Sequence, residues 1–390
     1  MLLDSTDHYD IHRRGRYLWA ALKRPHRVLS TCKVNGGLRE DLTHVANHQT
    51  CEGVAHGERY ARNQSALAGL DAFHRHACSE ASLPPATTAL MSTAANMQCA
   101  VLSRAAHRDL IVSVAATAGV LGNATRAGDP AGWHEWRDGC HAAQAPVDAS
   151  GHESPDEAGS GTIVLLVFIG QPCTAACLIR AATIVTEAKS TALIDLRMPS
   201  LQSSGLATGT GTDQVVIAAP LPHRQDDWER NWAGSHNTLG QLLAQATRDA
   251  VTRCLLLQNG VCAELRRSVC AALGRHGCDE STLLRHARTA LNATDAELFA
   301  KNLTALVHDP QSAAAAYALA EIVDLVGSGI IHREMARESI VNQAALLAAA
   351  VAVAPDQFAE LRDELQPHRS LTPGELAARA VALGFARKWR

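Results

Sequence analysis

Short apolar runs separated by polar turns dominate the chain up to about residue 257. Alternating or continuously apolar runs are typical of β-strands, whereas apolar positions that recur every three or four residues are typical of helices. These patterns predict an α/β or α+β domain with a central sheet over residues 27–257. Strands are predicted at 27–34, 43–49, 110–118, 161–169 and 214–220, and helices at 64–79, 174–195 and 239–257.

Three segments do not follow this alternation. Residues 1–26 are polar and basic, and we interpret them as a lead-in segment. Residues 129–160 are rich in proline, glycine, histidine and acidic side chains, which is typical of a long mobile insertion. Small polar residues at 91–96 are predicted to run into a helix start within 87–102.

From residue 258 onward the apolar spacing becomes that of amphipathic helices in a bundle. Asp279, Thr294 and Thr372 are placed to cap three of them. We therefore predict a separate all-α domain over 258–390, with no role assigned by its residues and with homo-oligomer formation as a candidate. Helices are predicted at 260–275, 279–290, 294–307, 311–326, 333–353, 355–365 and 373–386.

Composition and charge narrow the class of protein. A chain of 390 residues with 47% hydrophobic side chains suggests two domains with sizeable cores. The formal net charge of -3 offers no basic excess, so nucleic acid is not an expected partner. Apolar stretches such as 163–169 and 344–355 are too short to span a membrane, and the first residues lack the pattern of a secretory signal. We expect a cytoplasmic protein.

The 11 cysteines are scattered, and none of them forms a CxxC pair. This spacing argues against a zinc ribbon. In a chain without a secretory signal, we expect these cysteines to be reduced and to pack as small apolar side chains.

A threonine- and glycine-rich stretch precedes the predicted strand 214–220. Glycine allows backbone conformations that a side chain would forbid, and threonine hydroxyls both donate and accept hydrogen bonds. Polar turns at strand ends often hold the sites of α/β proteins, so this stretch is a candidate substrate cradle. An ordinary loop is the alternative. The candidate substrate-binding residues here are Thr208, Gly209, Thr210, Gly211 and Thr212.

Other polar turns also fall at predicted strand or helix ends, where they can converge on one side of a sheet. A cleft lined by backbone N–H groups, hydroxyls and carboxylates suits an amide-rich or phosphate-bearing small molecule. These turns add Asn35, Gly36, Gly37, Asn47, Thr93 and Asn123 to the candidate substrate-binding residues.

Three residues are candidates for acid–base chemistry. Glu187 lies in an otherwise apolar helix, where burial would raise its pKa; a surface position is the alternative. Asp213 either orients a base, binds a metal or caps a turn. His236 begins a predicted helix and is either a base, a ligand or a structural residue. With His48, these residues would be candidate ligands for a divalent metal if they converge.

Several short motifs occur in a characteristic order. The chain resembles the adenosylcobinamide amidohydrolase family over residues 27–257, and the resemblance is most specific at 186–189 and 207–213. It covers the segments 29–31, 35–38, 45–47, 90–95, 114–119, 122–124, 127–129, 161–163, 186–189, 207–213 and 234–240.

The resemblance implies an enzyme of cobinamide salvage that hydrolyses the amide between aminopropanol and a corrinoid. As a hypothesis, Glu187 is the general base, and Asp213 and His236 orient the base or protonate the leaving amine. Thr208, Thr210 and the backbone N–H groups of 209 and 211 would cradle the oxyanion or the substrate amide.

The chain departs from the family pattern at Val164, Ser235 and Asn237 and in the long, histidine-rich loop 129–160. Residues 258–390 lie outside the pattern. Two alternatives therefore stay open. The first is an enzyme of the same fold that acts on another nitrogen-rich metabolite, with or without a metal. The second is a non-enzymatic module that binds a corrinoid or another ligand.

Overall fold

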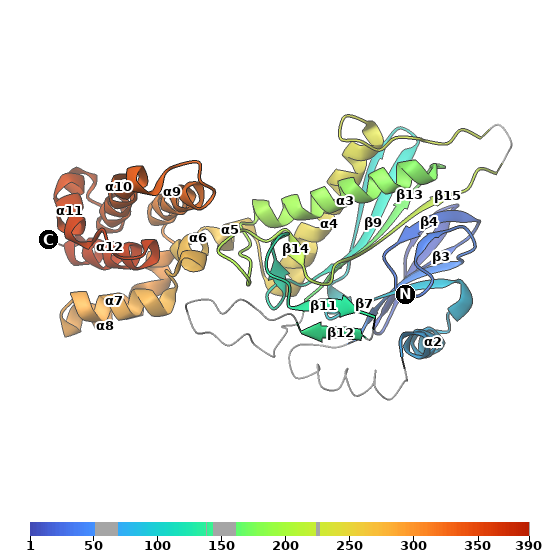
Figure 1. The fold of residues 1–390 in the computed structure, drawn as a ribbon, viewed down its shortest axis with the longest axis horizontal. Helices are drawn as coiled ribbons and strands as arrows, with labels where there is room; N and C mark the ends of the chain where they lie inside the picture. The colour runs from blue at the N-terminus through green and yellow to red at the C-terminus, as the bar shows by residue number, and fades with distance from the viewer. Residues whose placement is uncertain (51–68, 138, 143–160, 224–226, 390) are drawn as a thin grey trace. The chain divides into compact units, whose positions relative to one another are not determined.

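The computed structural model describes residues 1–50, 69–137, 139–142, 161–223 and 227–389. The chain divides into two compact units, which are described separately (Figure 1). The first unit comprises Met1–Gln202 and Leu206–Val261, and the second comprises Ser203–Gly205 and Cys262–Arg390.

A six-stranded mixed sheet, in the order β5-β4-β15-β13-β9-β8, forms the centre of the first unit. β13 and β15 are parallel, with Val164 opposite Gln214, and the other neighbours are antiparallel. The strands are β4 (His26–Ser30), β5 (Gly37–Arg39), β8 (Val101–His107), β9 (Leu110–Ala118), β13 (Ile163–Ile169) and β15 (Gln214–Pro220).

A second sheet has five strands, in the order β1-β2-β3-β6-β7, of which only the pair β6–β7 is parallel. The segment interpreted as a lead-in supplies three of these strands. Its apolar residues are buried at every second position, as at Tyr9 and Ile11. The strands are β1 (Leu2–Ser5), β2 (Tyr9–Arg14), β3 (Tyr17–Leu22), β6 (His44–Gln49) and β7 (Thr88–Thr93).

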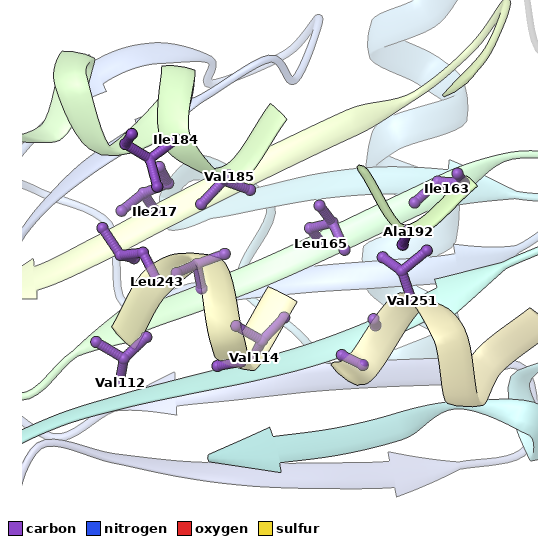
Figure 2. Packing of buried hydrophobic residues seen from close by; sticks show 14 of the residues in the cluster. Val112, Val114, Ile163, Leu165, Ile184, Val185, Ala192, Ile217, Leu243 and Val251 are labelled. Carbon is purple, nitrogen blue, oxygen red and sulfur yellow. The ribbon is translucent and has the colours of Figure 1, made fainter. Parts of the chain in front are cut away.

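The two sheets pack face to face, and helices cover both outer faces. Helices α3 (Ala175–Asp195) and α4 (Thr238–Asn259) lie on the six-stranded sheet, where Val185 and Leu243 meet β-branched side chains of the strands (Figure 2). Between the sheets, the rings of Tyr9 and Phe168 lie 4.4 Å apart. Helix α2 (Leu70–Ala81) packs on the outer face of the five-stranded sheet.

Short elements complete the first unit. β10 (Ala124–Thr125) pairs with β14 (Gly209–Thr210), and β11 (Trp133–Trp136) pairs with β12 (Gly139–Ala142). Residue 138 and residues 143–160 of the predicted mobile insertion lie outside the described residues, as do 64–68 of the first predicted helix. The remaining short elements of this unit are the 3-10 turns η2 (Pro85–Thr87) and η3 (Met97–Cys99). The short helix α5 (Ala263–Arg266) begins the second unit.

The predicted fold class is confirmed, but three predicted segments differ: 1–26 form strands, 260–275 form short helices instead of one, and 87–102 contain no α-helix start. Residues 87–102 do not lead into an α-helix; they form β7, the single turn η3 and the start of β8. Asn96 does act as a cap, since its side chain accepts a hydrogen bond from the N–H of Gln98, but it caps only that turn. The expected central sheet is accompanied by a second sheet of similar size.

The second unit is all helical, as predicted. Asp279 and Thr372 cap helices α7 and α12, and Thr372 forms a capping box with Glu375. Asn292, rather than Thr294, caps α8. The helices are α6 (Val269–Leu273), α7 (Glu280–Ala290), α8 (Ala293–Val307), α9 (Pro310–Gly327), α10 (Arg333–Ala352), α11 (Phe358–Leu365) and α12 (Pro373–Arg387), with 3-10 turns η4 (Gly274–His276), η5 (Pro355–Gln357) and η6 (Gln366–His368).

None of the helices in the described ranges is long and apolar enough to cross a lipid bilayer.

Candidate functional site

Asp213 is the centre of the hydrogen bonds around residues 208–212, which we call the threonine-glycine turn. Its Oδ1 accepts from the Ile163 N–H at 3.1 Å and from the Thr210 hydroxyl at 2.6 Å. Its Oδ2 accepts from the Thr210 N–H at 3.0 Å and from the Lys189 ammonium. One carboxylate therefore joins the first residue of β13, the turn and helix α3.

Lys189 and Asp213 form a largely buried ion pair, with 11% and 17% of their side chains exposed. A Cβ on Gly209 would lie 2.5 Å from the Lys189 Nζ and closer still to the Asp213 carboxylate. Only glycine at position 209 leaves room for the pair in its present position.

Lys189 is not among the site residues predicted from the sequence, although its spacing from apolar residues of the same helix points to it. Lys189 follows the buried Val185 by four residues and precedes the buried Ala192 by three, so it lies on the core-facing side of α3. A lysine in such a position needs a partner for its charge.

Thr208 is fixed at the start of the turn by bonds to two neighbouring segments. Its carbonyl accepts from the Ser190 hydroxyl at 2.8 Å, and its own hydroxyl accepts from the Ala127 N–H at 2.8 Å. Adjacent positions 189 and 190 of α3 therefore hold opposite ends of the same turn.

Asn123, Thr212 and the segment before β13 form the adjoining polar surface. The Asn123 amide donates to the Gly161 carbonyl at 3.0 Å and to the Thr212 hydroxyl at 3.2 Å. The Thr162 and Thr212 hydroxyl oxygens lie 2.7 Å apart. Gly211 and Thr212 are exposed, so the tip of the turn is open to a ligand.

The end of β7 approaches the same edge of the sheets. Gln214, directly after Asp213, donates through its side-chain amide to the Ser92 carbonyl at 2.9 Å. Thr93 is buried, and its hydroxyl accepts from the Ala95 N–H at 3.0 Å. The structure thus brings Thr93 near the threonine-glycine turn but uses its hydroxyl locally.

The segment 35–37 stabilises its own loop and does not line the threonine-glycine turn. Asn35 is in the left-handed region at φ 56°, and its amide donates to the carbonyls of Pro85 and Thr88 at 2.8 and 2.9 Å. A Cβ on Gly36 would clash with the Cys32 carbonyl, and Gly37 has φ 78°.

Asn47 and His48 point to opposite faces of β6, as neighbours on a strand do. Asn47 is buried between the sheets and donates to the Thr117 hydroxyl at 2.9 Å. His48 is buried on the other face, stacked on Tyr17 at 4.3 Å. Burial, assisted by the positive charge of Arg16, lowers the pKa of His48 to about 4.

Glu187 does not have the burial on which its predicted role as a base depended. Its side chain is 59% exposed, and its carboxylate lies 3.9 Å from the Arg180 guanidinium. Positions 187 and 189 are two residues apart and do not share a helix face, so Glu187 points away from the Lys189 side.

His236 is exposed in the loop before α4. The other end of this helix lies near the site, because Gln258 and Asn259 accept from the N–H groups of Asn96 and Val120. The 22 residues of α4 span about 33 Å, so His236 lies at the far end of the sheet from Asp213.

The four candidate metal ligands, His48, Glu187, Asp213 and His236, lie in four separate places. In the part of the chain that the structure describes, no three His, Cys, Asp or Glu side chains are grouped so that they could hold a metal ion. Both Asp213 oxygens already accept hydrogen bonds, so this residue does not fit the role of a ligand.

The chain is similar to known proteins over much of its length. An uncharacterized protein of Methanocaldococcus jannaschii is 26% identical over 257 residues, which cover 62% of this chain and 95% of that protein. The family model described as adenosylcobinamide amidohydrolase matches residues 2–263. This match spans the first unit, including the strands β1–β3 and the threonine-glycine turn, and the chain therefore belongs to the adenosylcobinamide amidohydrolase family.

Proposed function

We propose that this protein hydrolyses the amide bond that joins aminopropanol to a propionyl side chain of the corrin ring, as a step of cobinamide salvage. The observation that carries this proposal is the family match over the whole first unit. The polar edge around Asp213 supports it, because an amide substrate needs several fixed donors and acceptors.

In the proposed reaction, water adds to the amide carbon and the C–N bond breaks. The corrinoid keeps a carboxylate, and aminopropanol leaves with a proton as an ammonium ion. Gly211 and Thr212 are exposed residues of the turn, and Asn123 beside them is partly exposed. Thr208 and Thr210 hold the turn behind them through the bonds described above.

Asp213 acts in this proposal as a fixed anion that shapes the turn. A carboxylate offers about four lone-pair sites, and Asp213 accepts four hydrogen bonds. It has no site left for a proton of the substrate or of the attacking water.

The direct test is incubation of the full chain with adenosylcobinamide, followed by mass analysis of the products. We expect adenosylcobyric acid and aminopropanol in equal amounts. Adenosylcobyric acid, which lacks the amide in question, is the matched control and should remain unchanged. Corrinoid binding without amine release would instead support a binding module, and release from a different amide would support another substrate.

A further inference from the structure

We propose that Lys189 is a catalytic residue, which donates a hydrogen bond to the substrate's amide oxygen and stabilises the oxyanion formed when water adds. The inference rests on the proposed amide hydrolysis. It assigns to a helix residue the charge-stabilising role that the sequence suggested for the threonine-glycine turn alone.

The first support is the number of donors that Lys189 carries. A lysine ammonium has three N–H groups. Within the described ranges, Lys189 donates to a single acceptor, the Asp213 carboxylate. Two N–H groups therefore remain on a charge whose side chain is 11% exposed. These two N–H groups can donate to a ligand oxygen, and hydrogen bonds from a charged donor are strong at such burial.

The second support is the rigidity of this ammonium. Asp213 is fixed by bonds to Ile163 and Thr210, and it fixes Lys189 in turn. The Nζ lies against the backbone of Gly209, where no side chain intervenes. Donors that are held in place before the reaction stabilise a developing oxyanion most effectively, because they need not reorganise.

The third support is location. Lys189 reaches the turn from α3, and the exposed tip at Gly211 and Thr212 is two to three residues along the chain from Gly209. The proposal places the amide oxygen of a substrate bound at this tip beside the ammonium that lies against Gly209. Asp213 is then a positioning residue that acts through Lys189.

The test compares wild type with Lys189→Ala, using release of aminopropanol from adenosylcobinamide. Loss of one oxyanion donor typically lowers kcat by about 100- to 1,000-fold. We expect a fall of that size, KM within about threefold of wild type, and at least about tenfold recovery of kcat when ethylammonium is added. Such recovery would show that the missing group is a cation in the space of the lysine side chain, whereas a variant that has lost its fold would not recover.

Lys23→Ala is the matched control. Lys23 is also ion-paired in the first unit, with Asp10 at 2.8 Å, but it lies far along the chain from the site. We expect it to retain wild-type kcat and to be insensitive to ethylammonium. The Lys189 proposal is overturned if Lys189→Ala keeps kcat within about fivefold of wild type, if only KM changes, or if ethylammonium restores nothing.

Lys189→Ala leaves a carboxylate largely buried without its cation, which can prevent folding. The double variant Lys189→Ala/Asp213→Asn removes both charges and provides a second test. We expect it to fold and to remain at least about 100-fold slower than wild type, whereas wild-type turnover would overturn the proposal. If wild type itself releases no aminopropanol, the proposed function fails and the role of Lys189 fails with it.

Discussion

Gly209 is the residue at which space around the site is most restricted. A Cβ at this position would collide with both members of the Lys189–Asp213 pair. We expect Gly209→Ala to lower the free energy of unfolding by about 1–3 kcal/mol, as overpacking does, and to reduce turnover. Denaturant unfolding and the aminopropanol assay measure the two effects.

Gly211→Ala is the control for the stability measurement. The nearest atom to a Cβ at position 211 is the Asn123 Oδ1, at an ordinary 3.4 Å. We expect its free energy of unfolding to stay close to that of wild type. Equal destabilisation of the two variants would contradict the packing described around Gly209.

His48 should make stability depend on pH. Its folded-state pKa of about 4 lies below the 6.5 of a free histidine, so the unfolded chain binds the proton more readily. The contribution of His48 to the free energy of unfolding is unchanged above about pH 6.5 and falls as the pH decreases towards 4. At pH 5 the loss is about 2 kcal/mol.

Denaturant unfolding at pH 7 and pH 5 checks this expectation in wild type and in His48→Phe, which keeps an aromatic ring against Tyr17. The variant should lose about 2 kcal/mol less between the two values. His26, which is also buried with a pKa of about 4, keeps its contribution in both proteins. An identical loss in the two proteins would show that His48 is not held neutral.

Glu187 provides a test of the role predicted from its sequence motif. Because its carboxylate is exposed and faces Arg180, we expect Glu187→Gln to stay within about twofold of wild-type kcat. Steady-state kinetics on adenosylcobinamide measure this. A loss of 100-fold or more would re-establish Glu187 as the base despite its exposure.

The sequence singles out the threonine-glycine turn, but it does not show which of the predicted side chains lie beside it. The glycines and threonines of 208–212 stand out by composition, and Asp213 follows them directly. Glu187 stands out because its helix is otherwise apolar, and His236 because it begins a predicted helix. Neither feature reveals on which face of a helix or at which end of a sheet the residue lies. Lys189 required the helical phase of α3, which its buried neighbours define.

At the scale of elements, the strands with continuous or alternating apolar runs were predictable, and 214–220 has the bounds predicted for it. The strands β1–β3 were not. In β2 the buried Tyr9 and Ile11 alternate with the polar Asp10 and His12, so this strand reads as polar sequence, whereas β3 is apolar but too short to stand out. β3 pairs with β6 and so joins β1–β3 to the rest of the sheet. A single sequence does not reveal such a pairing partner.

Deletion of residues 1–24 tests the importance of these strands. The deletion removes three of the five strands of one sheet and the buried side chains of Tyr9, Ile11 and Leu18. We expect the shortened protein to be insoluble or to lack cooperative unfolding, which circular dichroism on heating would show. If the shortened protein folds and is active, the first unit does not need residues 1–24, as expected of a lead-in segment.

At the scale of the whole molecule, the two units have separate apolar cores. The clusters of the first unit end at Val261, and those of the second begin at Val269. We expect a chain that ends at residue 261 to unfold cooperatively and to release aminopropanol at a rate within about threefold of the full chain. Loss of activity in a folded fragment would give the helical unit a part in the reaction.

Light scattering on the full chain and on this fragment tests a further expectation from the sequence, namely that the helical unit mediates self-association. A smaller oligomer for the fragment would support it. Equal association states would assign any oligomer to the first unit.

The bond between the Ile163 N–H and Asp213 has a consequence for isotope exchange with solvent. The first amide of β13 is protected by a side chain of the site, so its deuterium uptake reports how often the hydrogen bond to Asp213 opens. The Thr210 amide shares the same acceptor group and should exchange in step with it. A ligand that binds Lys189 would slow deuterium exchange at both amides together. Exchange at the buried start of β13 would therefore report ligand binding at the exposed turn.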